Sequence, residues 1–75
     1  MRLEPFTMER DILQVGEEVT VTESKLPRAW YYTIEPAAAM SGNYGPSERI
    51  RSQKGIVRKK ELSGTTWTVT VEFDE

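Results

Sequence analysis

The sequence predicts an all-β fold, and three observations support that prediction. Near the end of the chain, apolar and polar residues alternate strictly, so one side of an extended strand there would carry Trp67, Val69, Val71 and Phe73. Weaker alternation recurs over residues 18–23 and 30–34. A Ser-Gly pair at 63–64 marks a tight hairpin connection. Because burying each apolar side chain contributes roughly 1.5–3 kcal/mol, the terminal strand is expected to form the floor of the core.

The first eighteen residues contain one ambiguous stretch and one turn. Pro5 opposes a continuous helix, residues 9–13 could form a helical turn, and an edge strand would use Leu3, Phe6 and Met8. Residues 15–18 are typical of a turn, with Gly16 free to adopt positive φ. A strand is expected next over residues 18–23, with its two valines facing inward.

The middle of the chain is predicted as a strand followed by a long irregular segment. Residues 30–34 alternate, and the face expected to be buried carries Trp30, Tyr32 and Ile34. Pro36 ends this strand, and residues 36–40 could form one helical turn. Ser47 is expected to N-cap a short turn over residues 48–51 whose Ile50 points inward. A connection as long as residues 35–54 is usually functional or mobile in so small a domain.

Residues 55–73 are predicted to form one β-hairpin. A strand opens at Gly55 and runs to about Leu62, and the Ser63-Gly64 connection leads into the terminal strand. With 75 residues, the chain is expected to be a single small β-barrel domain over residues 1–75, near the size at which one core is only just sufficient.

Composition excludes several classes of chemistry. The chain has no cysteine and no histidine, which removes sulfur-based zinc sites, thiolate nucleophiles and the commonest general base. No spacing pairs a nucleophile with a base, so we expect a protein that is not an enzyme, with no cofactor and no metal site. Without an apolar run suited to a signal peptide or a membrane span, the sequence predicts a cytoplasmic protein with no membrane association.

Charge is unevenly distributed, although the net charge is only −2. Residues 1–24 hold two basic and six acidic side chains, residues 25–60 hold eight basic and two acidic, and residues 61–75 hold four acidic and none basic. The chain is therefore acidic at both ends and basic in the middle.

Three fragments of the sequence resemble parts of small Src-homology-3-like barrels, including the KOW-type modules of ribosomal and transcription proteins. They are Val15-Gly16-Glu17-Glu18-Val19-Thr20-Val21, Gly55-Ile56-Val57 and Trp67-Thr68-Val69-Thr70-Val71-Glu72-Phe73-Asp74-Glu75, about half of the chain. The resemblance implies a partly open barrel with a long irregular loop. A barrel needs more strands than these three fragments provide. Either residues 3–8 and 30–34 form the additional strands, or an edge stays open beside the Trp67–Phe73 strand. Such an edge would invite pairing into a homodimer.

A basic stretch over residues 49–60 suggests one possible function. Six cations fall within these twelve residues: Arg49, Arg51, Lys54, Arg58, Lys59 and Lys60. They could contact the phosphates of RNA or DNA, since affinity for nucleic acid comes largely from lysine and arginine. The competing interpretation is a solvated hairpin face that the acidic termini partly neutralise.

Aromatic residues suggest another function, and we prefer it. Trp30, Tyr31 and Tyr44 are candidates for a shallow surface that binds an extended peptide, as the resemblance implies. Trp30 and Tyr32 fit the core better, which leaves Tyr31 and Tyr44 as the stronger candidates. The preferred hypothesis is a protein-interaction or accessory module that contacts its protein partner through residues 35–54, Tyr31 and the open edge. Nucleic-acid binding is the alternative.

Overall fold

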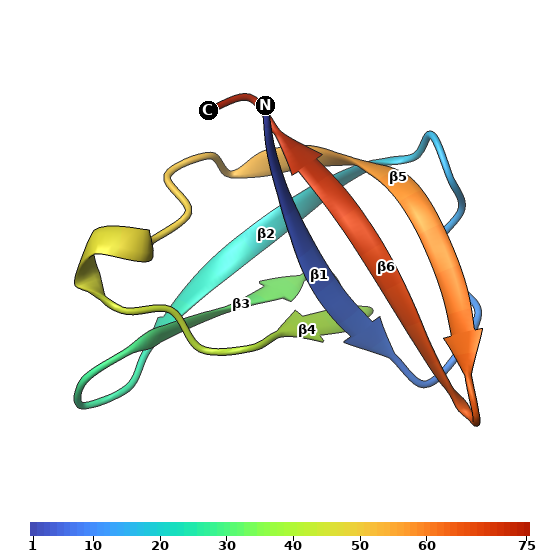
Figure 1. The fold of residues 1–75 in the computed structure, drawn as a ribbon, viewed down its shortest axis with the longest axis horizontal. Coiled ribbons are helices and arrows are strands. Elements are labelled where there is room, and N and C mark those ends of the chain that lie inside the picture. Colours follow the sequence, from blue (N-terminus) through green and yellow to red (C-terminus); the bar gives the residue numbers. More distant parts are fainter.

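Six antiparallel strands close into a barrel in the computed structural model, which describes residues Met1–Glu75 (Figure 1). The strands are β1 (Arg2–Met8), β2 (Glu18–Lys25), β3 (Trp30–Ile34), β4 (Ala39–Ser41), β5 (Lys54–Ser63) and β6 (Thr66–Phe73), with one short 3-10 helix, η1 (Pro46–Glu48). Their order around the barrel is β1-β4-β3-β2-β5-β6, and β6 pairs with β1 to close it. The predicted small all-β barrel is confirmed, and its architecture is compatible with both SH3-like and OB-like barrels.

The core is built on β6, as the alternation predicts. Val69, Val71 and Phe73 have no exposed surface, while Trp67 at the start of the strand is partly buried against the same cluster. From β1, Phe6 packs beside Phe73 with ring centroids 6.2 Å apart. The apolar side of the terminal strand therefore faces the barrel interior.

The open edge expected beside the Trp67–Phe73 strand does not exist, because β6 lies between β1 and β5 (Figure 1). The first residues do form a strand, but β1 is not an edge strand: it runs along β6 in a register from Arg2↔Phe73 to Met8↔Trp67 and pairs with β4 at Phe6 and Thr7 on its other side. Since β1 already takes up the hydrogen bonds of this edge, a homodimer cannot form by pairing there.

Residues 36–40 do not form the expected helical turn. A turn precedes β4, which pairs with β3 through Thr33↔Met40 and with β1 through Phe6↔Ser41. Ala38 and Ala39 are buried in the core. Pairing on both sides of this short strand outweighs the helix propensity of the alanines.

The capping prediction at Ser47 is also wrong, whereas the inward position of Ile50 is confirmed. Helix η1 begins at Pro46, so Ser47 lies inside it and Gly45 occupies the N-cap position. Proline is favoured at the first position of a helix because its fixed φ suits the turn and its missing N–H is not needed there. Ile50 is 4% exposed and belongs to the core cluster.

The β5–β6 hairpin forms with its connection one residue later than expected. β5 extends to Ser63, and Gly64 and Thr65 make the turn, with Gly64 at φ +64°. The positive φ expected at Gly16 is confirmed at +93°. A register irregularity between Val57 and Lys59 lets β5 bend around the barrel.

Candidate functional site

The candidate site is built where residues 42–53, the loop segment, cross the side of the barrel between β1 and β2 (Figure 1). β4 pairs with β1 only at Phe6 and Thr7, so the first half of β1 has no strand partner on that side. The loop segment covers this gap and carries η1. Hydrogen bonds to β1, β2 and β3 hold it in place.

Tyr32 anchors the middle of the loop segment from inside the barrel. Its hydroxyl donates to Glu23 Oε2 at 2.7 Å and accepts from the Ile50 N–H at 2.8 Å. Arg49 closes the cluster by donating to Glu23 Oε1 at 2.5 Å and Oε2 at 3.0 Å. The hydrogen bonds from Arg49, and then from Tyr32, lower the pKa of Glu23, so this carboxylate stays ionised at neutral pH.

Trp30 and Tyr44 join the loop segment to β3. Each donates its backbone N–H to the carbonyl oxygen of the other, at 2.9 and 2.8 Å. The guanidinium of Arg49 lies 4.6 Å from the centroid of the Trp30 ring. The Tyr44 hydroxyl donates to Glu4 at 2.9 Å, and burial, followed by this contact, raises the pKa of Tyr44.

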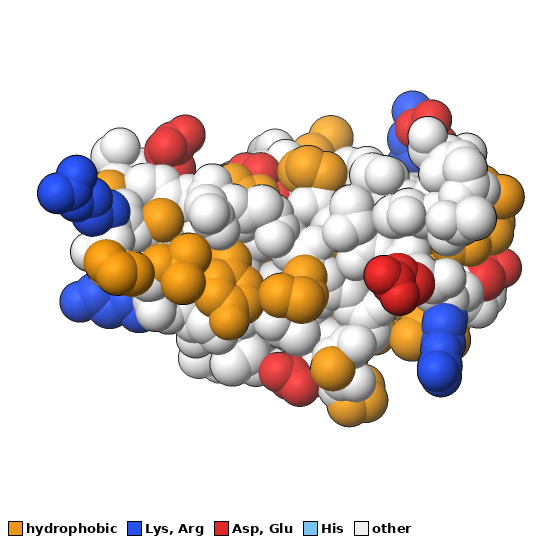
Figure 2. All heavy atoms as spheres, turned by 90° about the horizontal axis from the view of Figure 1, so that it is seen from below, with side chains coloured by type: hydrophobic (Ala, Val, Ile, Leu, Met, Phe, Trp, Pro, Cys, Tyr) orange, Lys and Arg blue, Asp and Glu red, His pale blue; other side chains and the backbone are white.

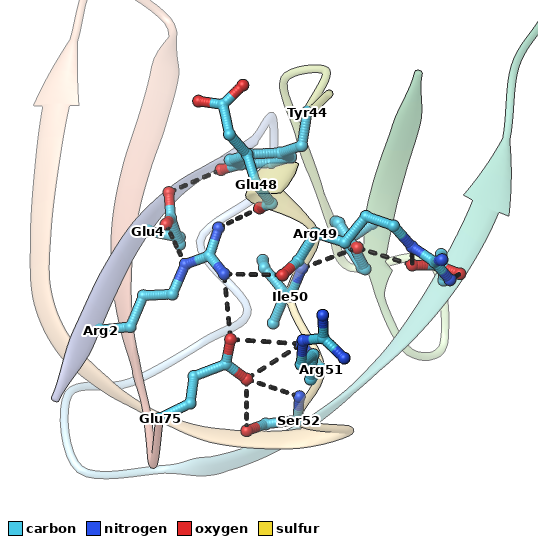
Figure 3. A network of polar contacts seen from close by, with 11 residues as sticks. Arg2, Glu4, Tyr44, Glu48, Arg49, Ile50, Arg51, Ser52 and Glu75 are labelled. Carbon is cyan, nitrogen blue, oxygen red and sulfur yellow. Dashed lines mark hydrogen bonds and ion pairs between the residues drawn. The ribbon is translucent and has the colours of Figure 1, made fainter. Parts of the chain in front are cut away.

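Arg2 and Glu75 hold the other side of the loop segment (Figure 3). The Arg2 guanidinium donates to the Glu4 carboxylate, to the carbonyl oxygens of Glu48 and Arg49, and to Glu75. Glu75 also accepts hydrogen bonds from the backbone N–H groups of residues 51 and 52 and from the Ser52 hydroxyl. Burial alone would raise the pKa of Glu75, but the hydrogen bonds from Ser52, Arg2 and Arg51 outweigh it and keep that pKa below its ordinary value.

A polar groove of about 580 Å³ lies between β2 and the loop segment. Its lining comprises Thr20, Val21, Thr22, Glu23, Tyr32, Pro46, Arg49, Ile50, Arg51, Ser52 and Gln53. Strand pairing of β2 with β5 ends at Thr20↔Lys54, and one further bond joins the Val21 N–H to the Gln53 carbonyl at 2.8 Å. Beyond Val21, no backbone hydrogen bond connects this edge of β2 to the loop segment. The barrel therefore has an unpaired edge on β2 rather than on β6.

The three predicted aromatic residues occupy different environments at this end of the barrel. Trp30 and Tyr44 are brought together, both partly buried against the core, and their backbones are bonded to each other. Tyr31 is partly exposed on β3, opposite Ser24 of β2, and its side chain makes no hydrogen bond. The Tyr44 hydroxyl is bonded to Glu4, and its ring packs against Tyr32 in an edge-to-face arrangement with ring centroids 5.7 Å apart, so Tyr44 braces the loop segment.

The six residues of the basic stretch do not form one patch of free cations. Four of them pair with carboxylates: Arg49 with Glu23, Arg58 with Glu72, Lys59 with Glu61 and Lys60 with Asp11. Neither Arg51 nor Lys54 forms a salt bridge through its side chain. Of these two, Arg51 lines the groove. The neutralisation expected from the acidic parts of the chain is thus present in the structure.

Hydrophobic surface gathers on the underside of the barrel. Figure 2 shows hydrophobic side chains concentrated on one half of the face seen from below, with lysine or arginine side chains toward its two ends. A second cleft of about 600 Å³ opens between the end of β1 and the turn before β4, and its lining includes Ile12, Ala37 and Met40. Ile12 and Met40 are each about half exposed.

Arg2 and Glu23 are the residues of the site that sequence reasoning missed, and Glu75 was expected only as part of the acidic terminus that neutralises the basic stretch. Each contacts the loop segment from a distant part of the chain, the Arg2–Glu75 pair spanning 73 positions. Isolated charges carry no periodic signal, and the dipolar charge pattern was the only hint that acidic termini would meet the basic middle.

Comparison with models of protein families, with curated proteins and with solved structures finds no match to this chain. The structure contains no helix with the length and apolar character needed to cross a bilayer. No three carboxylates lie close enough together to hold a metal ion. The site must therefore be interpreted from its own geometry.

Proposed function

We propose that this chain is a non-catalytic protein-interaction module that binds an extended acidic segment of a partner protein along the groove. The segment would add to the free edge of β2 and lie against the loop segment. We also propose that the barrel is SH3-like and of the KOW type, because the sequence Val-Gly-Glu-Glu-Val-Thr-Val at residues 15–21 and the β5–β6 hairpin resemble those modules. Since a chain this small carries no cysteine, we propose a cytoplasmic location.

The observation that carries this proposal is the unpaired edge of β2 inside the groove. The Val21 N–H points toward the loop segment, and backbone groups of a strand alternate in direction, so those of Glu23 and Lys25 point the same way. The pairs Thr22↔Thr33 and Ser24↔Tyr31 use the opposite edge for β3. An added strand would satisfy the free N–H and C=O groups, which is the basis of β-strand addition.

The charges that line the groove favour an acidic partner. Of its three charged side chains, Glu23 and Arg49 neutralise each other at 2.5 Å, and Arg51 has no carboxylate partner. Lys54 is exposed beside the groove, opposite Thr20. The groove therefore presents a net positive charge, which would steer an acidic segment into it.

Aromatic side chains near the groove offer additional contact area. Trp30 is partly exposed, with Arg49 stacked on its ring, and Tyr31 lies one strand behind the free edge. Partly exposed aromatic residues contribute strongly to binding because they bury large areas at low entropic cost. Tyr44 would act through the shape of the loop segment, because its own polar group is already bonded.

The nucleic-acid alternative receives less support from the geometry. Phosphate binding depends on unpaired cations, and only Arg51 and Lys54 of the six candidates are free of carboxylates. These two flank the same groove, so an acidic peptide uses them equally well. The unpaired cations therefore favour an acidic peptide over nucleic acid.

Selection from a random peptide library displayed on phage tests the proposal. Peptides rich in aspartate and glutamate should be enriched, and a selected peptide should shift the amide NMR signals of residues 21–25 and 51–53. Lys25→Pro should abolish binding by removing an N–H from the free edge of β2, whereas Lys25→Gln removes only the charge and should retain most of the binding. Arg51→Gln should weaken binding by about tenfold through loss of the free cation.

Two results would contradict this proposal. One is enrichment of peptides that bind equally well to the Lys25→Pro variant, since strand addition at β2 could not then explain the contact. The other is the absence of any enriched peptide together with tight, salt-sensitive binding of a labelled oligonucleotide, which would favour nucleic acid as the partner.

A further inference from the structure

Four hydrogen-bond donors from distant parts of the chain converge on one carboxylate, that of Glu75. The Ser52 N–H and Ser52 hydroxyl each donate to Oε2 at 2.7 Å, and the Arg51 N–H donates to the same atom at 3.0 Å. The Arg2 guanidinium donates to Oε1 at 2.9 Å. Figure 3 shows these donors arranged around the Glu75 side chain. They form a pocket suited to a negatively charged oxygen pair.

The donors do not need Glu75 to hold their positions. Three acceptors other than Glu75 fix the Arg2 guanidinium: the Glu4 carboxylate, the Arg49 carbonyl at 2.8 Å and the Glu48 carbonyl. Residues 51 and 52 lie between two anchors, the Ile50 N–H bonded to Tyr32 and the Gln53 carbonyl bonded to Val21. The pocket is therefore preorganised by the barrel.

The chemistry of the donor set is selective for oxyanions. Successive backbone N–H groups that point to one side form an anion-binding concavity, and an added guanidinium and hydroxyl match carboxylate or phosphate oxygens. Glu75 lies two residues beyond the end of β6 and takes no part in strand pairing. Apart from the contacts of its carboxylate, its only hydrogen bond runs from its N–H to the Phe73 carbonyl at 2.9 Å. Its withdrawal would break no strand pairing.

We propose that this pocket is an oxyanion-binding site, formed by Arg2, Arg51 and Ser52, that Glu75 occupies as a displaceable internal ligand. Its external ligand is a group of the carboxylate or phosphate class. Arg51 and Ser52 also line the groove between β2 and the loop segment, whereas Arg2 and Glu75 do not, so this site adjoins the proposed peptide site and differs from it by Arg2 and Glu75. It does not depend on the proposed function.

Titration of the Glu75→Ala variant with inorganic phosphate, and separately with acetate, tests this site. The amide NMR signals of Arg51 and Ser52 report on the pocket directly. In Glu75→Ala, phosphate should shift both signals saturably, with an apparent Kd at least about tenfold lower than in the unmodified chain, where the tethered carboxylate competes at high effective concentration. Acetate should shift the same two signals, because its carboxylate resembles the side chain of Glu75. Chloride, which has no oxygen atoms, should leave them unchanged.

Two control variants make the outcome decisive. Asp74→Ala removes a neighbouring carboxylate that takes part in no salt bridge, and this variant should behave like the unmodified chain. Arg2→Gln combined with Glu75→Ala should weaken phosphate binding by about tenfold. If Glu75→Ala disorders residues 50–53, the same titration on Glu75→Gln replaces it, because that side chain keeps the shape and loses the charge.

The proposal is overturned if a folded variant lacking the Glu75 carboxylate shows no phosphate-dependent or acetate-dependent shift at Arg51 and Ser52. Equal affinity in the unmodified chain and in Glu75→Ala would also overturn it, because Glu75 would then not occupy the binding site. Failure of the peptide selection leaves this proposal standing, because the titration depends on removing Glu75 and Arg2, and neither residue lines the groove.

Discussion

Gly55 and Val71 lie so close across the β5–β6 hairpin that a Cβ added to Gly55 would stand 2.5 Å from Val71 Cγ1. The same atom would lie 2.9 Å from the backbone oxygen of Glu72, which cannot move without breaking the sheet. Packing requires glycine at position 55, because Val71 on the neighbouring strand is fully buried and leaves no room for a side chain there.

Adding a methyl group at position 55 should destabilise the barrel. Gly55→Ala should lower the free energy of unfolding by about 1–3 kcal/mol, because overpacking forces neighbouring atoms apart. Gly42→Ala is the matched control, since a Cβ there would meet no atom within 4 Å. Urea denaturation followed by tryptophan fluorescence measures both. Equal stability of the two variants would contradict the packing described here.

Removing the Tyr32 hydroxyl should destabilise the loop segment. Tyr32→Phe leaves the buried Ile50 N–H without an acceptor and should cost about 1–3 kcal/mol of stability. Hydrogen exchange at the Ile50 amide should accelerate in this variant. Tyr31→Phe removes a hydroxyl that makes no hydrogen bond and should change neither quantity. Unchanged exchange at Ile50 in Tyr32→Phe would show that the hydroxyl does not anchor the loop segment.

Acidification should weaken the fold through Glu75 and Glu23. The folded state holds the pKa of both carboxyls below the ordinary value, so in the acidic range the unfolded chain binds more protons than the folded one. Their stabilising contribution is present above about pH 4.3, the ordinary value for glutamate, and is lost as the pH falls through the lowered pKa. Glu75→Gln should therefore lose less stability than the unmodified chain between pH 7 and pH 3, as measured by urea denaturation at each pH. An identical loss in both proteins would contradict the role given to Glu75.

Nucleic-acid binding, if present, should depend only weakly on salt. With two unpaired cations in the basic stretch, log K should fall with log salt with a slope no steeper than about −1.8 for a duplex. Fluorescence anisotropy of labelled RNA and DNA between low and moderate salt measures this slope. A slope near −5 would mean that the salt bridges of Arg49, Arg58, Lys59 and Lys60 open to contact phosphates, and it would restore the alternative function.

Much of the fold was predictable because strand signals are local. Alternation of side chains with a period of two identified β2, β3 and β6, together with the inward faces of Val69 and Tyr32, since the alternation depends only on neighbouring residues. The Ser-Gly turn signal at 63–64 identified the hairpin to which β5 belongs. The positive φ of Gly16 was predictable for the same reason. The all-β class therefore followed from local patterns, whereas the expectation of a barrel came from the resemblance to small Src-homology-3-like barrels.

The tertiary structure alone decided how the barrel closes and where the site lies. β4 follows a Pro-Ala stretch with helical propensity and exists because β1 and β3 pair on both of its sides. Arg2 and Glu75 meet across 73 positions, and Glu23 meets Arg49 across 26. Contacts between residues so far apart are set by the closed path of the backbone rather than by any neighbouring residue, so no local pattern encodes them.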